Sequence, residues 1–515
     1  MIPFEAPTEE ILFSLRHVAG VDRLSDWDEE TARDILGHFA ELAEGAIAPL
    51  NASGDAEGAR LENGRVRMPE GFAGAYRLIA EGGWQGLTAP EEFGGMGLSP
   101  VIGAGVSEVF SGANHALQMV CNLVPGAIST LMRFGTEDQK ASWIPRLAGG
   151  EVLSTMCLTE PGAGSDLSAI RSRALRDGEG WRIEGEKIFI SGGDQDLSDG
   201  ILHLVLARTG VPEDGVRGLS LFLCPGQPGA KVTRIEEKLG LHASPTCHMV
   251  FDGAGAELVG AEGEGLKAMF TLMNHARLDV ALQGTAHAER AARIARAYAG
   301  ERRQGRLPDG AAAMLADHAD VRRMLAEQAI LAMTARAMCH VTLVELEEGG
   351  RPALAEFLTA LCKVFGSEAG IAAADLGIQI LGGYGYLTEY GMEQVWRDAR
   401  ICAIYEGANG IHTRGLATRG LRPGGGAEAF EDLVAELSDG DAGAAEALEA
   451  WRHARHWLGN VPDPTPHAEA FYRKTAGLLR RAIWCRIGRV ADHHPDPERV
   501  RHLADCVLKA REFPA

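Results

Sequence analysis

The feature that most constrains the fold of this chain is a change in hydrophobic periodicity along it. Residues 1 to about 150, and the residues after Gly265, carry apolar positions three and four apart, which predicts helices. Between them, from about 154 to 260, short apolar or alternating runs such as "WRIEGEKIFIS" are separated by turns, which predicts an antiparallel β domain. A doubly wound nucleotide-binding fold alternates strands with helices, so this order predicts a different, α+β architecture.

The length of the chain and a Gly/Pro-rich stretch within it indicate several domains. A chain of 515 residues exceeds what one hydrophobic core normally serves. The Gly/Pro-rich stretch "RPGGGAEA" separates a last helical segment from the helices before it. We therefore expect an N-terminal α-helical domain at 1–153, a middle β domain at 154–262, a C-terminal helical domain at 263–421 and a helical C-terminal extension at 422–515.

The charge and the cysteines narrow the class of protein. With 71 acidic against 50 basic residues the formal net charge is -21, which argues against a nucleic-acid surface. The nine cysteines form no C-x-x-C pair and no H-E-x-x-H helix accompanies them, so we expect no metal site and no disulfide framework. The N-terminus lacks a basic signal region and no 18 apolar residues run together, so we expect a cytoplasmic protein without membrane insertion.

The stretch "ICAIYEGANG", residues 401–410, places Glu406 after an apolar run and directly before Gly407. Such a carboxylate is often a cap or one half of an ion pair, and Arg397 and Arg400 are close enough in sequence to be partners. The alternative is a general base in a poorly hydrated position, because desolvation raises the pKa of a glutamate from about 4.3 towards neutrality. The stretch alone leaves both interpretations open.

Two motifs of the middle region present groups that suit a flat, polar-edged cofactor. "MCLTEPGAGSD" ends a strand-like run in a Gly-rich turn whose hydroxyls and backbone donors could bind a cofactor edge or a pyrophosphate. It lacks the third glycine of a Rossmann fingerprint, and an ordinary tight turn would explain its glycines equally. In "GEKIFISGG", Phe189 and Ser191 are two apart and so share one face of a strand, where they could contact a ring system or pack in the core.

Two further motifs lie in the second helical region. In "QILGGYGYLTEY", glycines follow a helical run, where they serve as C-caps or allow a ligand to approach the backbone closely. In "NHARLDVALQG", Asn274 and Arg277 share a helix face and could bind a ligand tail, although a solvated arginine is the commoner case.

Taken in order, these motifs and "WRDARICAIYEG" resemble the acyl-CoA dehydrogenase family over about residues 80 to 420. The sequences of three motifs are most similar to the branch that acts on 3-(methylthio)propanoyl-CoA: "MCLTEPGAGSDL", "KIFISGGDQDL" and "MFTLMNHARLDVALQG". The resemblance implies a C-terminal four-helix bundle and FAD as the cofactor. It also implies that Glu406 removes the α-proton of an acyl-CoA while a hydride leaves the β-carbon for flavin N5, which gives a trans-2-enoyl-CoA.

The resemblance also assigns the binding residues. Those that match contacts to the flavin ring are Met156, Leu158, Thr159, Gly164, Ser165, Phe189 and Ser191. Those that match contacts to the FAD phosphates of a neighbouring subunit are Arg302, Gln304, Gln379, Gly382 and Gly383, although "ERRQGR" is one residue shorter than the usual R-x-x-F-G. Those that match contacts to the acyl-CoA are Ser165, Asn274, Arg277 and Gly407, with the backbone N–H of Glu406 polarising the thioester carbonyl.

By the same resemblance we expect a homo-oligomer, a dimer or a tetramer, that passes its electrons to an electron-transfer flavoprotein. Met269, Phe270 and Met273 suggest a short acyl pocket, because methionine adapts to a thioether or a short alkyl tail, although core packing explains each of them as well. Two other functions remain open: an acyl-CoA oxidase that uses oxygen, and a non-catalytic flavin-binding protein of the same fold. The acidic balance and the presence of Glu406 weigh against the last.

Overall fold

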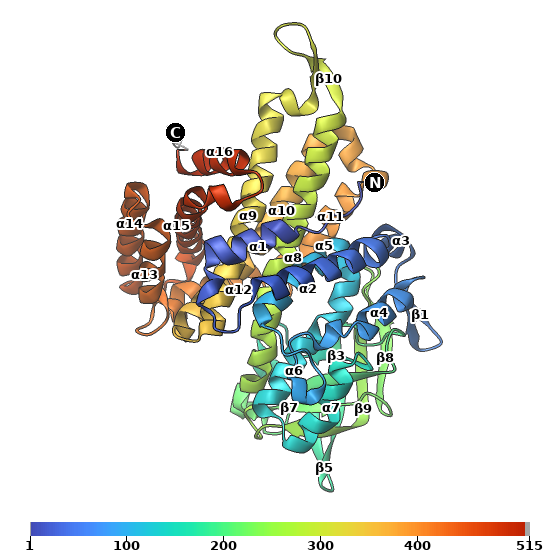
Figure 1. Cartoon of the computed structure of the whole chain (residues 1–515). Helices are drawn as coiled ribbons and strands as arrows, with labels where there is room; N and C mark the ends of the chain where they lie inside the picture. Colours follow the sequence, from blue (N-terminus) through green and yellow to red (C-terminus); the bar gives the residue numbers. More distant parts are fainter. Residues whose placement is uncertain (1, 510–515) are drawn as a thin grey trace. The chain divides into compact units, whose positions relative to one another are not determined.

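The helices and strands of the computed structural model follow the predicted change of periodicity, and the structure describes residues 2–509 (Figure 1). The chain forms two compact units, and neither is continuous in sequence. The first comprises Met1–Glu41, Pro100–Gly112 and Arg277–Ala515, and the second comprises Leu42–Ser99 and Ala113–Ala276. The long helices α5 (Pro100–Cys121) and α8 (Gly265–Glu301) contribute residues to both units.

The N-terminal region is helical, as its periodicity predicted. Besides α5 it contains α1 (Thr8–Phe13), α2 (Glu29–Leu42), α3 (Leu50–Glu57), α4 (Phe72–Glu81), α6 (Leu123–Phe134) and α7 (Glu137–Ala148). Helix α7 begins at a capping box in which Thr136 and Gln139 satisfy each other's backbone N–H groups. One hairpin departs from the helical prediction: β1 (Arg60–Glu62) pairs with β2 (Arg65–Arg67) across Asn63-Gly64. Both turn residues have positive φ, and Asn-Gly is a strong hairpin signal that could have identified this turn.

The middle region forms a mixed sheet. Its strands are β3 (Val152–Cys157), β4 (Arg173–Asp177), β5 (Gly180–Ser191), β6 (Gly200–Arg208), β7 (Leu219–Cys224), β8 (Ala230–Ile235) and β9 (Thr246–Val259). The order is β3-β6-β4-β5-β9-β7, with β8 on β9, and β6 also pairs with β7, so that five of the strands close into a barrel.

The expectation of a wholly antiparallel sheet was wrong for two pairs of strands. Strand β3 pairs with β6 in parallel, and β4 also makes a parallel pair with the end of β6. Because β4 and β5 intervene in the chain between β3 and β6, the connection is long enough for a parallel arrangement. The alternation of apolar residues does not distinguish the two pairings, since it reports only which face of a strand is buried.

The C-terminal region is helical apart from one hairpin. Its long elements are α8, α9 (Ala319–Glu348) and α10 (Pro352–Leu381), followed by α11 (Met392–Ala399) and α12 (Asn409–Thr418). Helix α10 packs against α9, α11 and α12. The hairpin of β10 (Arg303–Arg306) and β11 (Ala312–Met314), which the helical periodicity did not predict, projects beyond the ends of α8 and α9 (Figure 1).

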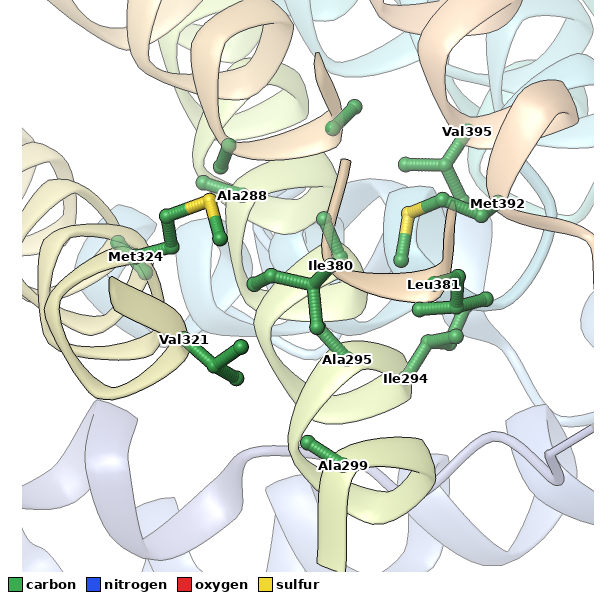
Figure 2. Packing of buried hydrophobic residues seen from close by; sticks show 14 residues of the cluster. Ala288, Ile294, Ala295, Ala299, Val321, Met324, Ile380, Leu381, Met392 and Val395 are labelled. Atoms are coloured by element: carbon green, nitrogen blue, oxygen red, sulfur yellow. The ribbon is translucent and has the colours of Figure 1, made fainter. Parts of the chain in front are cut away.

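Apolar side chains, many of them alanines, fill the space between these helices. Figure 2 shows the cluster, in which Ala288, Ile294, Ala295 and Ala299 of α8 lie beside Val321 and Met324 of α9, Ile380 and Leu381 of α10, and Met392 and Val395 of α11. Helices α8 and α10 approach so closely that a Cβ on Gly284 would lie 2.1 Å from the carbonyl oxygen of Gly366. Only glycine permits that approach, which fixes the level at which the two helices cross.

The extension consists of α13 (Ala427–Ser438), α14 (Ala442–Gly459), α15 (Ala468–Arg489) and α16 (Pro497–Leu508). It belongs to the first unit and packs there through α15, where the Trp484 indole donates a hydrogen bond of 2.8 Å to Thr334 of α9. Arg486 donates to the carbonyl of His17 at 3.0 Å. The extension therefore joins α9 to the N-terminal segment.

Two helical segments, Ala319–Glu348 and Pro352–Tyr386, are long and apolar enough to span a membrane by composition. Within the structure, 89% and 72% of their most apolar windows are buried against other parts of the protein. Burial of that extent is typical of core helices, whose apolar residues face protein rather than lipid.

Candidate active site

Glu406 occupies a left-handed backbone conformation in the turn that precedes α12. Its φ is 54°, and Gly407 follows with a φ of 93°. Such values are uncommon for residues other than glycine, and they persist where the surrounding structure enforces them, often at functional sites. Among the described residues five non-glycine residues have positive φ, and two of these, Glu406 and Phe189, are predicted site residues.

Several side chains hold the turn that contains Glu406. The Lys363 ammonium of α10 donates to the carbonyl of Gly407 at 2.6 Å and to the Asn409 side chain at 2.9 Å. Nε2 of His412 lies 3.1 Å from the carbonyl oxygen of Glu406. The Tyr405 hydroxyl donates to the side chain of Gln283 on α8. The turn is thus fixed on both sides of Glu406.

The environment of the Glu406 carboxyl group favours a base over a structural ion pair. Its Oε2 atom is buried and accepts no hydrogen bond. Burial raises the pKa of Glu406 to about 7, while the positive charges of Arg277 and Lys363 act in the opposite direction. The nearby sequence candidate Arg397 instead pairs with Glu393, within α11. A carboxyl group with a pKa near neutrality can both accept and release a proton at physiological pH.

Arg277 and Asn274 lie three residues apart on α8, as the sequence predicted. Arg277 is half-buried rather than solvated, and burial lowers its pKa while Glu406 acts in the opposite direction. Asn274 is exposed. Met269 and Met273 are buried, and Phe270 is 40% exposed. Gly407 is half-buried, and a Cβ there would lie 2.9 Å from His412.

The second group of predicted residues lies in the β barrel unit, at the loop after β3. Met156, Leu158 and Thr159 are half-buried, and Gly164 and Ser165 are exposed. The carbonyl of Thr159 accepts a hydrogen bond of 2.9 Å from Ile188, the residue before Phe189. The structure therefore brings this loop next to the segment of β5 that carries Phe189 and Ser191.

A buried ion pair that the sequence reasoning missed holds this loop in place. The Lys187 ammonium of β5 lies 2.8 Å from the Glu160 carboxylate and also donates to the carbonyls of Leu158 and Leu206. Glu160 accepts two further bonds from the backbone N–H groups of Arg171 and Ser172. One signal could have found the pair, since Lys187 is a charged residue within the apolar half of a strand.

Phe189 lies in a β-bulge, which corrects the expectation of a regular strand. Lys187 pairs with Met249 of β9 and Ile190 pairs with Cys247. Two residues of β5 therefore lie opposite the single residue His248, so β5 has one extra residue there. The extra residue is Phe189, with a φ of 60° and a side chain that is 60% exposed. Its ring is available to a ligand, while Ser191 two residues on is half-buried.

These residues fit a flavin ring by their own geometry. An aromatic ring is exposed at the bulge, and hydroxyl groups and backbone donors lie on the adjoining loop. The backbone of that loop is open, because a Cβ at Gly162 or Gly164 would have no atom within 4 Å. A flat ligand can therefore approach the main chain closely there.

The third group lies where α10 ends. The Arg302 guanidinium stacks over the Tyr384 ring at 5.2 Å, and Tyr384 in turn packs against Tyr390 at 5.2 Å. Gln379, Gly382 and Gly383 are exposed, and a Cβ on either glycine would meet no atom within 4 Å. The structure thus brings Arg302 to the glycine segment. Gln304 lies instead in the β10–β11 hairpin, where its carbonyl contacts His318 at 2.8 Å.

A cavity of about 170 Å³ lies elsewhere in the barrel unit, lined by Asp194, His203 and Lys231 among others. It contains none of the predicted site residues. The predicted site residues therefore lie outside this cavity.

The fold is of the α+β class, with a closed β sheet between two helical regions. The desolvated carboxyl group in a left-handed turn is a candidate general base, as an enzyme would require. The N-terminal, middle and C-terminal domain models of acyl-CoA dehydrogenase match residues 29–151, 155–254 and 263–421, so the chain belongs to the acyl-CoA dehydrogenase family. The predicted family and fold are confirmed. The extension lies beyond the three matched ranges.

Similar proteins support this assignment over most of the chain. The sequence is 41% identical to 3-methylmercaptopropionyl-CoA dehydrogenase of Ruegeria pomeroyi, over 88% of this chain and 83% of that protein. It is 34% identical to the broad-specificity linear acyl-CoA dehydrogenase FadE5 of Mycobacterium tuberculosis, over 80% of this chain and 74% of that protein. The crystal structure of acyl-CoA dehydrogenase from Geobacillus kaustophilus matches with a TM-score of 0.68 at 26% identity, over 78% of this chain and 100% of that one. The protein is a flavin-dependent acyl-CoA dehydrogenase, and the family binds FAD.

Proposed function

We propose that this enzyme oxidises the Cα–Cβ bond of a short acyl-CoA thioester, with Glu406 as the base that removes the α-proton. One observation carries the proposal: Oε2 of Glu406 is buried and accepts no hydrogen bond, in a turn that the surrounding side chains fix. A carboxylate that gives up hydration before substrate arrives has a proton-accepting atom free for the reaction.

The work of the protein is to position the thioester and to receive the proton. The thioester carbonyl acidifies the α-hydrogen, and more so when the backbone N–H of Glu406 donates to it. A positioned base contributes roughly 10² to 10⁴ in rate, so orientation and carbonyl polarisation supply much of the acceleration. Arg277 and Lys363 favour the ionised form of Glu406, which is the form that accepts the proton.

FAD, when bound, supplies the acceptor for the hydride that leaves the β-carbon. The residues that would hold its ring are those of the loop after β3 together with Phe189 and Ser191. Arg302, Gln379, Gly382 and Gly383 would hold the phosphates of a cofactor bound to a second subunit. This assignment requires a homo-oligomer, and the exposure of the glycine segment at the end of α10 supports it.

We propose a short acyl group, of butanoyl or 3-(methylthio)propanoyl size. The relative from Ruegeria pomeroyi is named for 3-methylmercaptopropionyl-CoA, and it is similar over most of its length. The buried Met269 and Met273 on α8, beside the partly exposed Phe270, support a compact pocket with polarisable walls. An electron-transfer flavoprotein is the proposed acceptor of the electrons, and the cytoplasm is the proposed location.

Anaerobic titration of the yellow enzyme with butanoyl-CoA tests the role of Glu406. The wild-type enzyme should bleach, and Glu406→Gln should keep its FAD and remain yellow, because an amide has the shape of the acid and accepts no proton. Asn274→Ala serves as a control, since weaker substrate binding would raise the concentration needed and leave the bleaching complete. Bleaching of Glu406→Gln at the wild-type rate would place the base elsewhere.

A further inference from the structure

Lys363 is a buried lysine whose hydrogen-bond acceptors are both uncharged. Its side chain is fully buried in α10, and its ammonium donates to the carbonyl of Gly407 at 2.6 Å and to Oδ1 of Asn409 at 2.9 Å. Lys187 is buried to the same extent, but it bonds directly to the Glu160 carboxylate at 2.8 Å. Burial of a charge without a bonded counterion is costly, so the position of Lys363 calls for a reason other than stability.

Both bonds of Lys363 hold the stretch of backbone that follows the candidate base. Gly407 directly follows Glu406, and Asn409 is the first residue of α12. Asn409 is itself held, because its amide donates to Ser367 of α10 at 3.1 Å. Lys363 therefore ties Gly407 and Asn409, the first and third residues after Glu406, to one rigid helix. This restraint opposes relaxation of the positive φ of Glu406, a conformation that costs on the order of 1 kcal/mol or more for a residue with a Cβ.

The charge of Lys363 also acts on Glu406. It opposes the effect of burial and lowers the pKa of that carboxyl group. Burial in turn lowers the pKa of Lys363 to about 8. The other ionisable groups that interact with its charge include Cys402, Glu406, Arg277, Glu368 and His412. The ammonium is therefore mostly charged at pH 7, where Glu406 is partly ionised.

We infer that Lys363 is a positioning residue of the reaction, which holds the Glu406 turn through Gly407 and Asn409 and favours the ionised carboxylate with its charge. The inference rests on the proposed role of Glu406 as the base. Lys363 does not touch the reacting atoms in this scheme. It acts by fixing the position of the Glu406 carboxylate and by lowering the pH at which that carboxyl group ionises.

The test measures removal of the α-proton separately from oxidation of the substrate. The probe is 3,3-dimethylbutanoyl-CoA, which has α-hydrogens but no β-hydrogen to lose, and the rate of α-proton exchange with D₂O is measured by NMR from pH 5 to 9. Lys363→Met should retain FAD and exchange roughly tenfold to a hundredfold more slowly at neutral pH. The acid limb of its pH profile should move to higher pH by about one unit, because a nearby positive charge is lost.

Lys187→Met is the matched control, a buried lysine lost from the barrel unit. It should lower the melting temperature and the FAD content, and the fraction that retains FAD should keep the wild-type position of the acid limb. A Lys363→Met enzyme that loses stability to the same extent but keeps the wild-type acid limb would overturn the inference, because Lys363 would then be only structural.

Two further variants keep the outcomes separate. Asn409→Ala removes one acceptor of Lys363 and leaves its charge, so it should slow exchange without moving the acid limb. It decides the positioning part if Lys363→Met does not fold, and a wild-type exchange rate in Asn409→Ala would contradict that part. Exchange by Glu406→Gln at the wild-type rate would overturn the proposed base itself, whatever the Lys363 variants do.

Discussion

The Lys187 ammonium and the Glu160 carboxylate form an ion pair of 2.8 Å in which both side chains are buried. The pair joins β5 to the loop that carries Thr159, Gly164 and Ser165. Removal of one partner of a buried pair leaves the other charge without compensation, which costs more than the pair itself contributes. The proposed flavin loop therefore depends on two residues that need not touch the flavin.

Lys187→Met or Glu160→Gln should each destabilise the protein by about 3 to 5 kcal/mol and lower its FAD content. The double variant should be less destabilised than the sum of the two, because neither charge is then left alone. Urea unfolding of the protein and flavin absorbance measure the two effects. Loss of the exposed pair between Arg323 and Asp320 should cost less than about 1 kcal/mol and serves as the control. Buried-pair variants as mild as that control would contradict the role given to Lys187.

Glu406→Gln should stabilise the protein at pH 8 and have little effect at pH 5. The pKa of Glu406 rises from 4.5 to about 7 on folding, so the folded state holds this proton more firmly than the unfolded state does. The resulting stability is fully present below pH 4.5 and is lost as the pH rises through 7. At pH 8 the wild-type protein carries a desolvated charge that the amide lacks, a difference of at most about 3 kcal/mol.

Melting temperatures of the wild-type protein and Glu406→Gln at the two pH values measure this difference. The same substitution at Glu446, an exposed residue of α14, should produce no such dependence on pH. A Glu406→Gln protein that is less stable than wild type at pH 8 would mean that the carboxylate is compensated in the folded protein.

Arg302→Ala should lose FAD and weaken subunit assembly together. If Arg302 bonds a phosphate of a cofactor shared between subunits, its loss removes a charge-assisted bond of about 1.5 to 3 kcal/mol. Tyr384→Leu should have a smaller effect in the same direction, since the ring on which Arg302 stacks is lost. Flavin content and light scattering measure the two properties. Arg323→Ala on the exposed face of α9 is the control, and an Arg302→Ala monomer with a full complement of FAD would refute the shared site.

The catalytic efficiency should be highest for short acyl groups, about butanoyl to hexanoyl or 3-(methylthio)propanoyl in size. Each buried methylene contributes only about 0.8 kcal/mol, so kcat/KM should fall in steps as the chain outgrows the pocket. Steady-state rates with butanoyl-, octanoyl- and palmitoyl-CoA measure this. A preference for palmitoyl-CoA would show that the methionines of α8 do not close the pocket, while membership of the family would stand.

The sequence by itself determined the features that depend on residues close to one another in the chain. The period of the apolar residues separated the helical regions from the β region, because side-chain period follows from local backbone geometry. The spacing of the motifs was specific enough to indicate the family. The sequence also contains a local signal for the hairpin at Asn63-Gly64, because Asn-Gly favours this type of turn.

Only the tertiary structure decided the environment of Glu406 and the shape of the barrel. Arg277 and Lys363 come to the carboxyl group from α8 and α10, and the glycine contact between Gly284 and Gly366 sets how closely those helices cross. The parallel pairing of β3 with β6 and the bulge at Phe189 likewise depend on strands distant in sequence. The physical reason is that desolvation and long-range charge are properties of what surrounds a residue in space. The apolar run beside Glu406 in the sequence suggests a poorly hydrated environment, but the helices that pack against Glu406 create that environment.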